Sequence, residues 1–182
     1  MTITNLKKVI QQAQSNRSAV VGFVVQGWED ARVFVKAGSE LNKPVVLQAG
    51  PGCRENTPLP VLAKMFRVLG ENSDYDVVPH LDHALDIETC HRALDEGFTS
   101  VMFDGSELNL KENIKQTYAV RKLAEQYNSS VEAEIGFVGY SKHTKNKPTN
   151  PEEAAKLVAE TNIDALAVSI GNTHLQLKKN TV

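Results

Sequence analysis

The chain has 182 residues, a formal net charge of −2 and 41% hydrophobic residues, which is typical of a globular protein with one well-filled core. The absence of a basic stripe argues against nucleic acid as a partner, and no apolar run approaches the ~20 residues of a membrane span. Cys53 and Cys90 form no CxxC pattern, and the polar start lacks the apolar core of a signal peptide. We therefore expect a cytoplasmic protein that does not associate with membranes.

Segments of helical periodicity alternate with short, apolar, β-branched segments along the whole chain. The predicted strands cover residues 20–26, 44–49, 77–84, 100–104, 131–135 and 165–170. The predicted helices cover residues 5–16, 28–42, 58–70, 86–97 and 109–128, and a last helix begins at 150–153. Residues 50–52 are expected to close a strand as a turn, residues 136–149 form a polar loop, and residues 175–182 are assigned to no element.

Six strand–helix alternations predict parallel strands covered by helices, in one domain that spans residues 1–182. A (β/α)8 barrel needs eight such units and typically ~250 residues, so the chain supplies about three quarters of one. An open, doubly wound sheet is the alternative architecture. It is disfavoured because no glycine-rich nucleotide fingerprint follows the first strand.

Ionisable residues recur where the predicted strands end. Asp82 and His83 end the third strand, Asp104 the fourth and Glu134 the fifth, and His174 follows the sixth. Active sites of such folds lie at the carboxyl ends of the strands. Two imidazoles and a carboxylate can form a catalytic zinc site if one coordination position stays open. A metal held there would polarise a carbonyl and stabilise an enediolate, while a nearby carboxylate moves a proton.

Plainer interpretations exist for most of these residues. Because strand pleating sends neighbours to opposite faces, Asp82 and His83 can both point inward only if the strand bends. His80 shares the inward side with Asp82 and is favoured as a hydrogen-bonded core residue. Asp104 either belongs to the site or caps the turn that follows it. Residues expected to lie in the core or on the surface, outside the site, are His91, His143, Cys53 and Cys90.

Two further carboxylates, Glu132 and Glu134, interrupt the otherwise apolar fifth strand. A buried strand carries such groups only at a desolvation cost, which favours a functional role for them.

Several segments, in the same order along the chain, resemble motifs of the class II, metal-dependent ketose-bisphosphate aldolases, the fructose- and tagatose-bisphosphate enzymes. The similarity extends from Val20 to His174. The matching segments are His80-Leu81-Asp82-His83, residues 98–106 and 112–114, Val131-Glu132-Ala133-Glu134-Ile135-Gly136, and residues 164–174, which end in Gly171-Asn172-Thr173-His174.

The resemblance implies an incomplete TIM barrel that reversibly cleaves a ketose 1,6-bisphosphate, or a similar phosphorylated ketose, to dihydroxyacetone phosphate and an aldehyde. It implies a cytoplasmic enzyme of carbohydrate metabolism, of the glycolytic type, that forms a homodimer or homotetramer. It assigns Asp82 as the acid/base at the aldehyde oxygen, and His83 and His174 as zinc ligands. Glu134 and Asp104 are assigned to the metal region, with Glu132 and His80 as supporting residues around it. Gly171 and Asn172 are assigned to substrate binding. A second divalent or monovalent cation can sit near the acidic residues.

The sequence also departs from the family pattern. The family's third zinc histidine on strand seven and its phosphate-binding Asn-x-Asp-Thr segment on strand eight have no counterpart before residue 182. Lys142 stands about where the family's proton-abstracting glutamate is expected, and Leu175-Gln176-Leu177 replaces the usual Gly and Tyr. We therefore expect an incomplete version of such an enzyme, with strands seven and eight missing.

Two alternatives to this expectation differ in class. One is a non-catalytic chain that needs the missing part or a partner. The other is a Schiff-base aldolase, which is disfavoured because the strand at 165–170 has no lysine.

Overall fold

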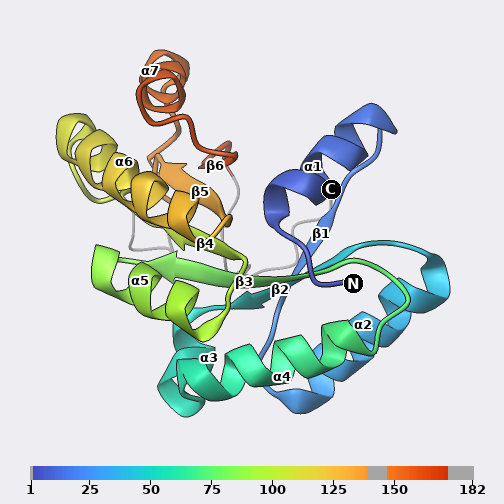
Figure 1. The fold of residues 1–182 in the computed structure, drawn as a ribbon. Coiled ribbons are helices and arrows are strands. Elements are labelled where there is room, and N and C mark those ends of the chain that lie inside the picture. The colour runs from blue at the N-terminus through green and yellow to red at the C-terminus, as the bar shows by residue number, and fades with distance from the viewer. Residues whose placement is uncertain (1, 139–146, 172–182) are drawn as a thin grey trace.

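A computed structural model describes residues 2–138 and 147–171, which form one six-stranded sheet and seven helices (Figure 1). The strands are β1 (Val21–Val24), β2 (Val45–Ala49), β3 (Val77–Ala84), β4 (Ser100–Phe103), β5 (Ser130–Ile135) and β6 (Ala165–Val168). The helices are α1 (Leu6–Ser15), α2 (Trp28–Leu41), α3 (Pro51–Asn56), α4 (Leu59–Glu71), α5 (Ile87–Glu96), α6 (Leu110–Gln126) and α7 (Pro151–Thr161). All six predicted strands and all six predicted helices are confirmed.

Helix α3 differs from the prediction, because residues 50–52 were expected to form only a turn. Pro51 occupies the first turn of α3, a position that proline favours because its missing N–H has no partner there in any case. The glycines on either side obscured this helix start in the sequence.

Every strand pairs in parallel with its neighbour in the sequence, in the order β1-β2-β3-β4-β5-β6. A doubly wound sheet reverses its strand order near the middle, so this sequential order excludes that alternative. Figure 1 shows the sheet with helices α2 to α7 on one side and α1 on the other. The arrangement is an open, partial (β/α)8-type barrel with six of the eight strands.

The two faces of the sheet bury different sets of residues. On the outer face, strand residues such as Leu47, Leu81 and Val101 pack into the main core with Phe66 of α4 and Phe98. On the inner face, Leu6 and Val9 of α1 pack against Val46 and Val78, near the start of β2 and β3. Helix α1 therefore covers the amino-terminal end of the interior and leaves the carboxyl end of the strands accessible.

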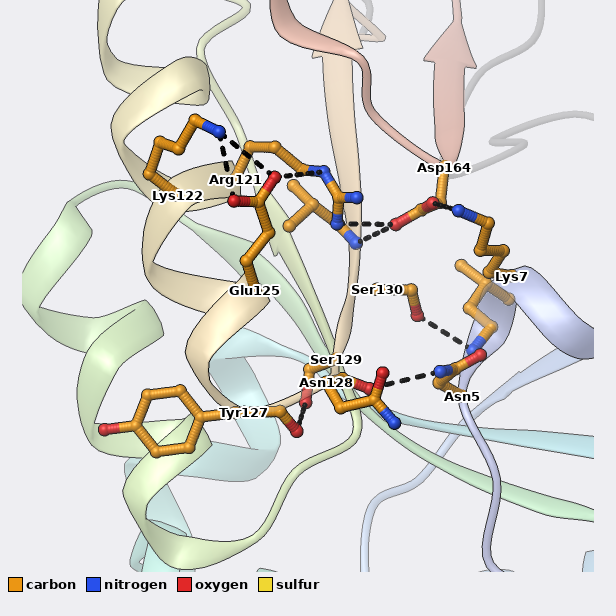
Figure 2. Close-up of polar contacts among 12 residues, drawn as sticks. Asn5, Lys7, Arg121, Lys122, Glu125, Tyr127, Asn128, Ser129, Ser130 and Asp164 are labelled. Carbon is orange, nitrogen blue, oxygen red and sulfur yellow. Dashed lines mark hydrogen bonds and ion pairs between the residues drawn. The ribbon is translucent and has the colours of Figure 1, made fainter.

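A polar cluster joins α1, α6 and β6 at the amino-terminal end of the sheet (Figure 2). Asp164 lies immediately before β6 and forms ion pairs with Lys7 of α1 at 3.1 Å and Arg121 of α6 at 3.3 Å. Asp164 Oδ2 also accepts a hydrogen bond from the Val131 backbone N–H of β5 at 3.0 Å. We call Lys7, Arg121, Asp164 and the Val131 amide the Asp164 cluster. It fixes the start of the edge strand β6.

Strands β1 and β6 form the two edges of the sheet, and among the described residues no further strand pairs with them. Val24 of β1 is 52% exposed, and Ile170 after β6 is 84% exposed. Both are apolar positions that a closed barrel would cover, because closure pairs the first strand with the last. None of the helices in the described part of the chain is long and apolar enough to cross a membrane.

Candidate metal centre and active site

The third strand contains a bulge at the point where its ionisable residues occur. Leu81 pairs with Val101, but the next pair is Ala84 with Phe103, so β3 carries one extra residue between them. His83 has a backbone φ of 49°, in the left-handed region that few non-glycine residues adopt. This is the bend that the sequence required if neighbouring Asp82 and His83 were both to reach the site.

The bulge places His83 beside carboxylates from the next two strands. His83 Nδ1 is hydrogen-bonded to Asp104 Oδ2 at 2.8 Å, and it lies 3.5 Å from Glu134 Oε2. Asp82 is 8% exposed and shares the inner face with His80. Four predicted site residues, Asp82, His83, Asp104 and Glu134, therefore meet at the carboxyl ends of β3, β4 and β5.

The Asp104 carboxylate caps the turn that follows β4 and also contacts His83. While Oδ2 bonds to His83, Oδ1 accepts a hydrogen bond from the Ser106 N–H at 3.1 Å. The turn after β4 thus orients the carboxylate that contacts the histidine. Burial alone would raise the pKa of Asp104, but its hydrogen bonds with His83 and Ser106 outweigh burial and lower it.

His80 and Glu132 form a second layer deeper in the interior. His80 is fully buried, and its Nδ1 is hydrogen-bonded to Ser100 Oγ at 2.8 Å, as expected for a core histidine. Its Nε2 lies 3.5 Å from Glu132 Oε2. Burial lowers the pKa of His80 to about 4, so this imidazole is neutral at pH 7.

Burial and neighbouring charges also shift the pKa of Glu132, Glu134 and His83. Burial, reinforced by Asp82, raises the pKa of Glu132 to about 7. Burial and repulsion by Asp104 raise the pKa of Glu134 above its ordinary range. Burial would lower the pKa of His83, but the Asp104 hydrogen bond and the surrounding carboxylates outweigh it and raise that pKa. A carboxyl group that titrates near pH 7, such as that of Glu132, is suited to taking and giving protons.

The backbone of Glu134 is held by a side chain of helix α6. Asn113 Nδ2 donates a hydrogen bond to the Glu134 carbonyl oxygen at 2.9 Å, and Asn113 Oδ1 accepts one from Thr117 Oγ1 at 2.9 Å. Gly105 packs directly against this asparagine, because a Cβ atom at Gly105 would lie 2.3 Å from Asn113 Oδ1. A glycine is therefore required there by close approach.

His83, Asp104 and Glu134 could hold a divalent cation. One ligand atom from each lies within 4.8 Å of the others. Glu134 Oε2 is buried and accepts no hydrogen bond from any residue in the described part of the chain. An imidazole and carboxylate oxygens are ligands that Zn²⁺ accepts, and a cation would offset the cost of burying a carboxylate oxygen without a donor. The residues present therefore fit the implied metal.

Of the remaining predicted residues, only Gly171 lies in the described part of the chain. Gly171 is exposed after β6, with a φ of 101°. Asn172, His174 and Lys142 lie outside the described residues.

Arg54, by contrast, contacts the bulge and was not singled out in the sequence. Its guanidinium donates to the backbone carbonyl oxygens of Asp82 and His83. No spacing motif signals such a contact.

Comparison with known proteins agrees with the geometry. A family profile described as "Fructose-bisphosphate aldolase class-II" matches residues 4–182. A fructose-bisphosphate aldolase of Giardia intestinalis is 34% identical over 178 residues, which are 96% of this chain and 55% of that protein. The D-tagatose-1,6-bisphosphate aldolase subunit GatY of Klebsiella oxytoca is 33% identical over 180 residues, covering 96% of this chain and 63% of that one.

The fold also matches a solved aldolase structure. The crystal structure of the YdjI aldolase from Escherichia coli K12 superimposes with a TM-score of 0.85 at 29% identity, over 94% of this chain and 64% of that one. The chain thus spans about 55–64% of the length of these proteins. Because the family profile covers nearly all of its residues, the chain belongs to the class II fructose-bisphosphate aldolase family.

Proposed function

We propose that this chain carries the first part of the active site of a zinc-dependent aldolase, which reversibly cleaves a ketose 1,6-bisphosphate to dihydroxyacetone phosphate and an aldehyde. The observation that carries the proposal is the convergence of Asp82, His83, Asp104 and Glu134 at the carboxyl ends of three adjacent strands. The related proteins named for fructose- and tagatose-bisphosphate cleavage support this substrate class.

The proposed roles follow from the positions of the side chains. His83, Glu134 and Asp104 would hold the metal together with His174. Asp104 would also orient His83 through its hydrogen bond. When bound, Zn²⁺ would supply a Lewis acid that polarises the carbonyl group of the substrate. We also propose that a second divalent or monovalent cation can bind near the acidic residues around His83.

Asp82 is proposed as the acid/base. In cleavage it would take the proton of the hydroxyl group that becomes the aldehyde oxygen, and in condensation it would return that proton. Its nearly buried position among other carboxyl groups suits a group that exchanges a proton in a water-poor site. Glu132 and His80 would support it from the layer below, and Gly171 and Asn172 are proposed to contact the substrate.

The experiment measures release of dihydroxyacetone phosphate from fructose and tagatose bisphosphate, with added Zn²⁺ and with a chelator. We expect chelator-sensitive cleavage that Asp82→Asn lowers by about 10²-fold or more, the range for loss of a general acid/base. The exposed Asp74→Asn variant is the matched control. The proposal fails if zinc titration shows no binding and His83→Ala changes nothing. Chelator-insensitive cleavage that borohydride traps would indicate a Schiff base instead.

A second candidate is a non-catalytic chain that needs the remaining part of the barrel, supplied by further polypeptide. The exposed apolar residues at the β1 and β6 edges favour it. In that case the chain binds zinc without cleaving substrate, and cleavage appears when the missing strands are supplied. We also propose that the protein is cytoplasmic and forms a homodimer or homotetramer. Sedimentation equilibrium tests the oligomeric state.

A further inference from the structure

Arg54 joins the ends of two neighbouring strands through backbone carbonyl groups. From helix α3 its Nη1 donates to the carbonyl oxygen of Ala49, the last residue of β2, at 2.6 Å. The same nitrogen donates to the carbonyl oxygen of Asp82, and Nη2 donates to that of His83 at 3.1 Å. One partly buried guanidinium thus contacts both residues that form the bulge of β3.

The Arg54 contacts lie at the bulge, where the β3 backbone lacks regular ladder hydrogen bonds. A bulge disrupts the regular ladder, and the β3–β4 pairing resumes only when the Asp104 N–H donates to the Ala84 carbonyl oxygen at 2.8 Å. His83 also holds a left-handed φ of 49°, which persists only when surrounding contacts impose it. Arg54 supplies hydrogen-bond donors to the carbonyl groups on both sides of this strained backbone.

The bulge in turn determines where two side chains point. In a regular strand Asp82 and His83 would face opposite sides of the sheet. With the bulge, Asp82 stays on the inner face while His83 Nδ1 reaches Asp104 and Glu134. The three Arg54 hydrogen bonds all go to main-chain oxygens, so they act on the shape of the site through the backbone.

We propose that Arg54 is a positioning residue that holds the β3 bulge in the shape that brings Asp82 and His83 to the metal centre. The consequence for metal binding rests on the proposed function, whereas the consequence for the bulge does not. A planar guanidinium can bridge three carbonyl oxygens, and the single ammonium group of a lysine cannot reproduce that fork. Arg54 therefore resembles the supporting residues of metal sites, whose loss typically weakens metal binding about 10–100-fold.

The first measurement uses the metal-free 182-residue chain. Backbone amide and Cα chemical shifts of Asp82, His83 and Ala84 report the bulge directly. We expect Arg54→Gln to move the His83 Cα shift away from its left-handed value and Arg54→Lys to move it less. Arg67→Gln, a change of an exposed arginine on α4, is the matched control and should leave these shifts unchanged. If Arg54→Gln does not fold, Arg54→Lys decides the question alone.

The second measurement is titration of the same variants with Zn²⁺ and with Co²⁺ as a spectroscopic probe. We expect Arg54→Gln to weaken binding about 10–100-fold and Arg54→Lys to restore part of the loss. If His83→Ala weakens binding but Arg54→Gln stays within about twofold of wild type with unchanged shifts, the Arg54 inference is wrong and the metal site stands. If His83→Ala has no effect, the proposed metal site is wrong, and the shifts of the metal-free protein still decide whether Arg54 holds the bulge.

Discussion

Replacement of Asp164 by alanine should destabilise the fold far more than loss of its half-exposed cationic partner Lys7. The Asp164 side chain is 3% exposed, and it binds three donors from different elements: the Lys7 ammonium, the Arg121 guanidinium and the Val131 N–H. Figure 2 shows Lys7 and Arg121 approaching this carboxylate from different sides. Alanine removes all three interactions at the start of an edge strand.

The magnitude follows from the burial of each partner. The half-exposed Lys7 pair is worth only about 0.2–1 kcal/mol. The Val131 N–H, if left without an acceptor, costs about 1–3 kcal/mol. Arg121 is 13% exposed, and among the described residues it would keep only the ion pair with Glu125, at 3.8 Å. Breaking such a buried pair typically costs about 3–5 kcal/mol. These costs share one carboxylate and are not additive, so we expect Asp164→Ala to lower the free energy of unfolding by about 3–5 kcal/mol, the cost of the Arg121 pair.

Equilibrium urea unfolding followed by circular dichroism measures this change. Lys7→Ala should cost less than about 1 kcal/mol. The loss of unfolding free energy for Asp164→Asn should lie between those for Lys7→Ala and Asp164→Ala, because an amide oxygen can still accept a hydrogen bond from the Val131 N–H. Glu40→Ala, which removes an exposed pair on α2, is the control and should be nearly neutral. The reasoning is refuted if Asp164→Ala and Lys7→Ala lower the unfolding free energy by the same amount.

Three further predictions concern the site. Asp104→Asn removes the charge and the strong acceptor beside His83, so the pKa of His83 in the metal-free protein should fall. An NMR titration measures this pKa, and an unchanged His83 midpoint would contradict the prediction. The folded-state pKa of His80, about 4, lies below the ordinary 6.5, so its stabilising contribution is present above pH 6.5 and is lost as pH falls toward 4. Relative to His80→Gln, the wild type should therefore lose about 3 kcal/mol of unfolding free energy as the pH falls from 6.5 to 4. If the unfolding free energies of the two proteins change in parallel with pH, the prediction is wrong. Gly105→Ala should lower the free energy of unfolding by about 1–3 kcal/mol, because the new Cβ overlaps the Asn113 side chain. Gly52→Ala is the control and should be tolerated, because a Cβ there meets nothing within 4 Å. Equal thermal stabilities of the two variants would show that the overlap relaxes freely.

The local elements could be predicted because their signals lie within a few residues. The Asn109 and Asn150 side chains cap α6 and α7, and Asp86 and Gly97 bound α5, as the sequence indicated. The clustering of Asp82, His83, Asp104 and Glu134 could also be expected, because parallel strands bring their carboxyl ends to one edge. The contributions of Lys142, Asn172 and His174 remain predictions.

The sequence by itself determined the alternation of strands and helices, the parallel sheet and the set of ionisable residues at its carboxyl edge, since these follow from local periodicity. Only the tertiary structure decided that β3 bulges at Asp82 and His83, that Asp104 serves both its turn and the histidine, and that Arg54 binds the bulge. The bulge depends on the register with β4 and on an arginine 28 residues before Asp82. Such long-range contacts leave no periodic pattern in the chain, so the shape of the site emerges only when the strands pack together.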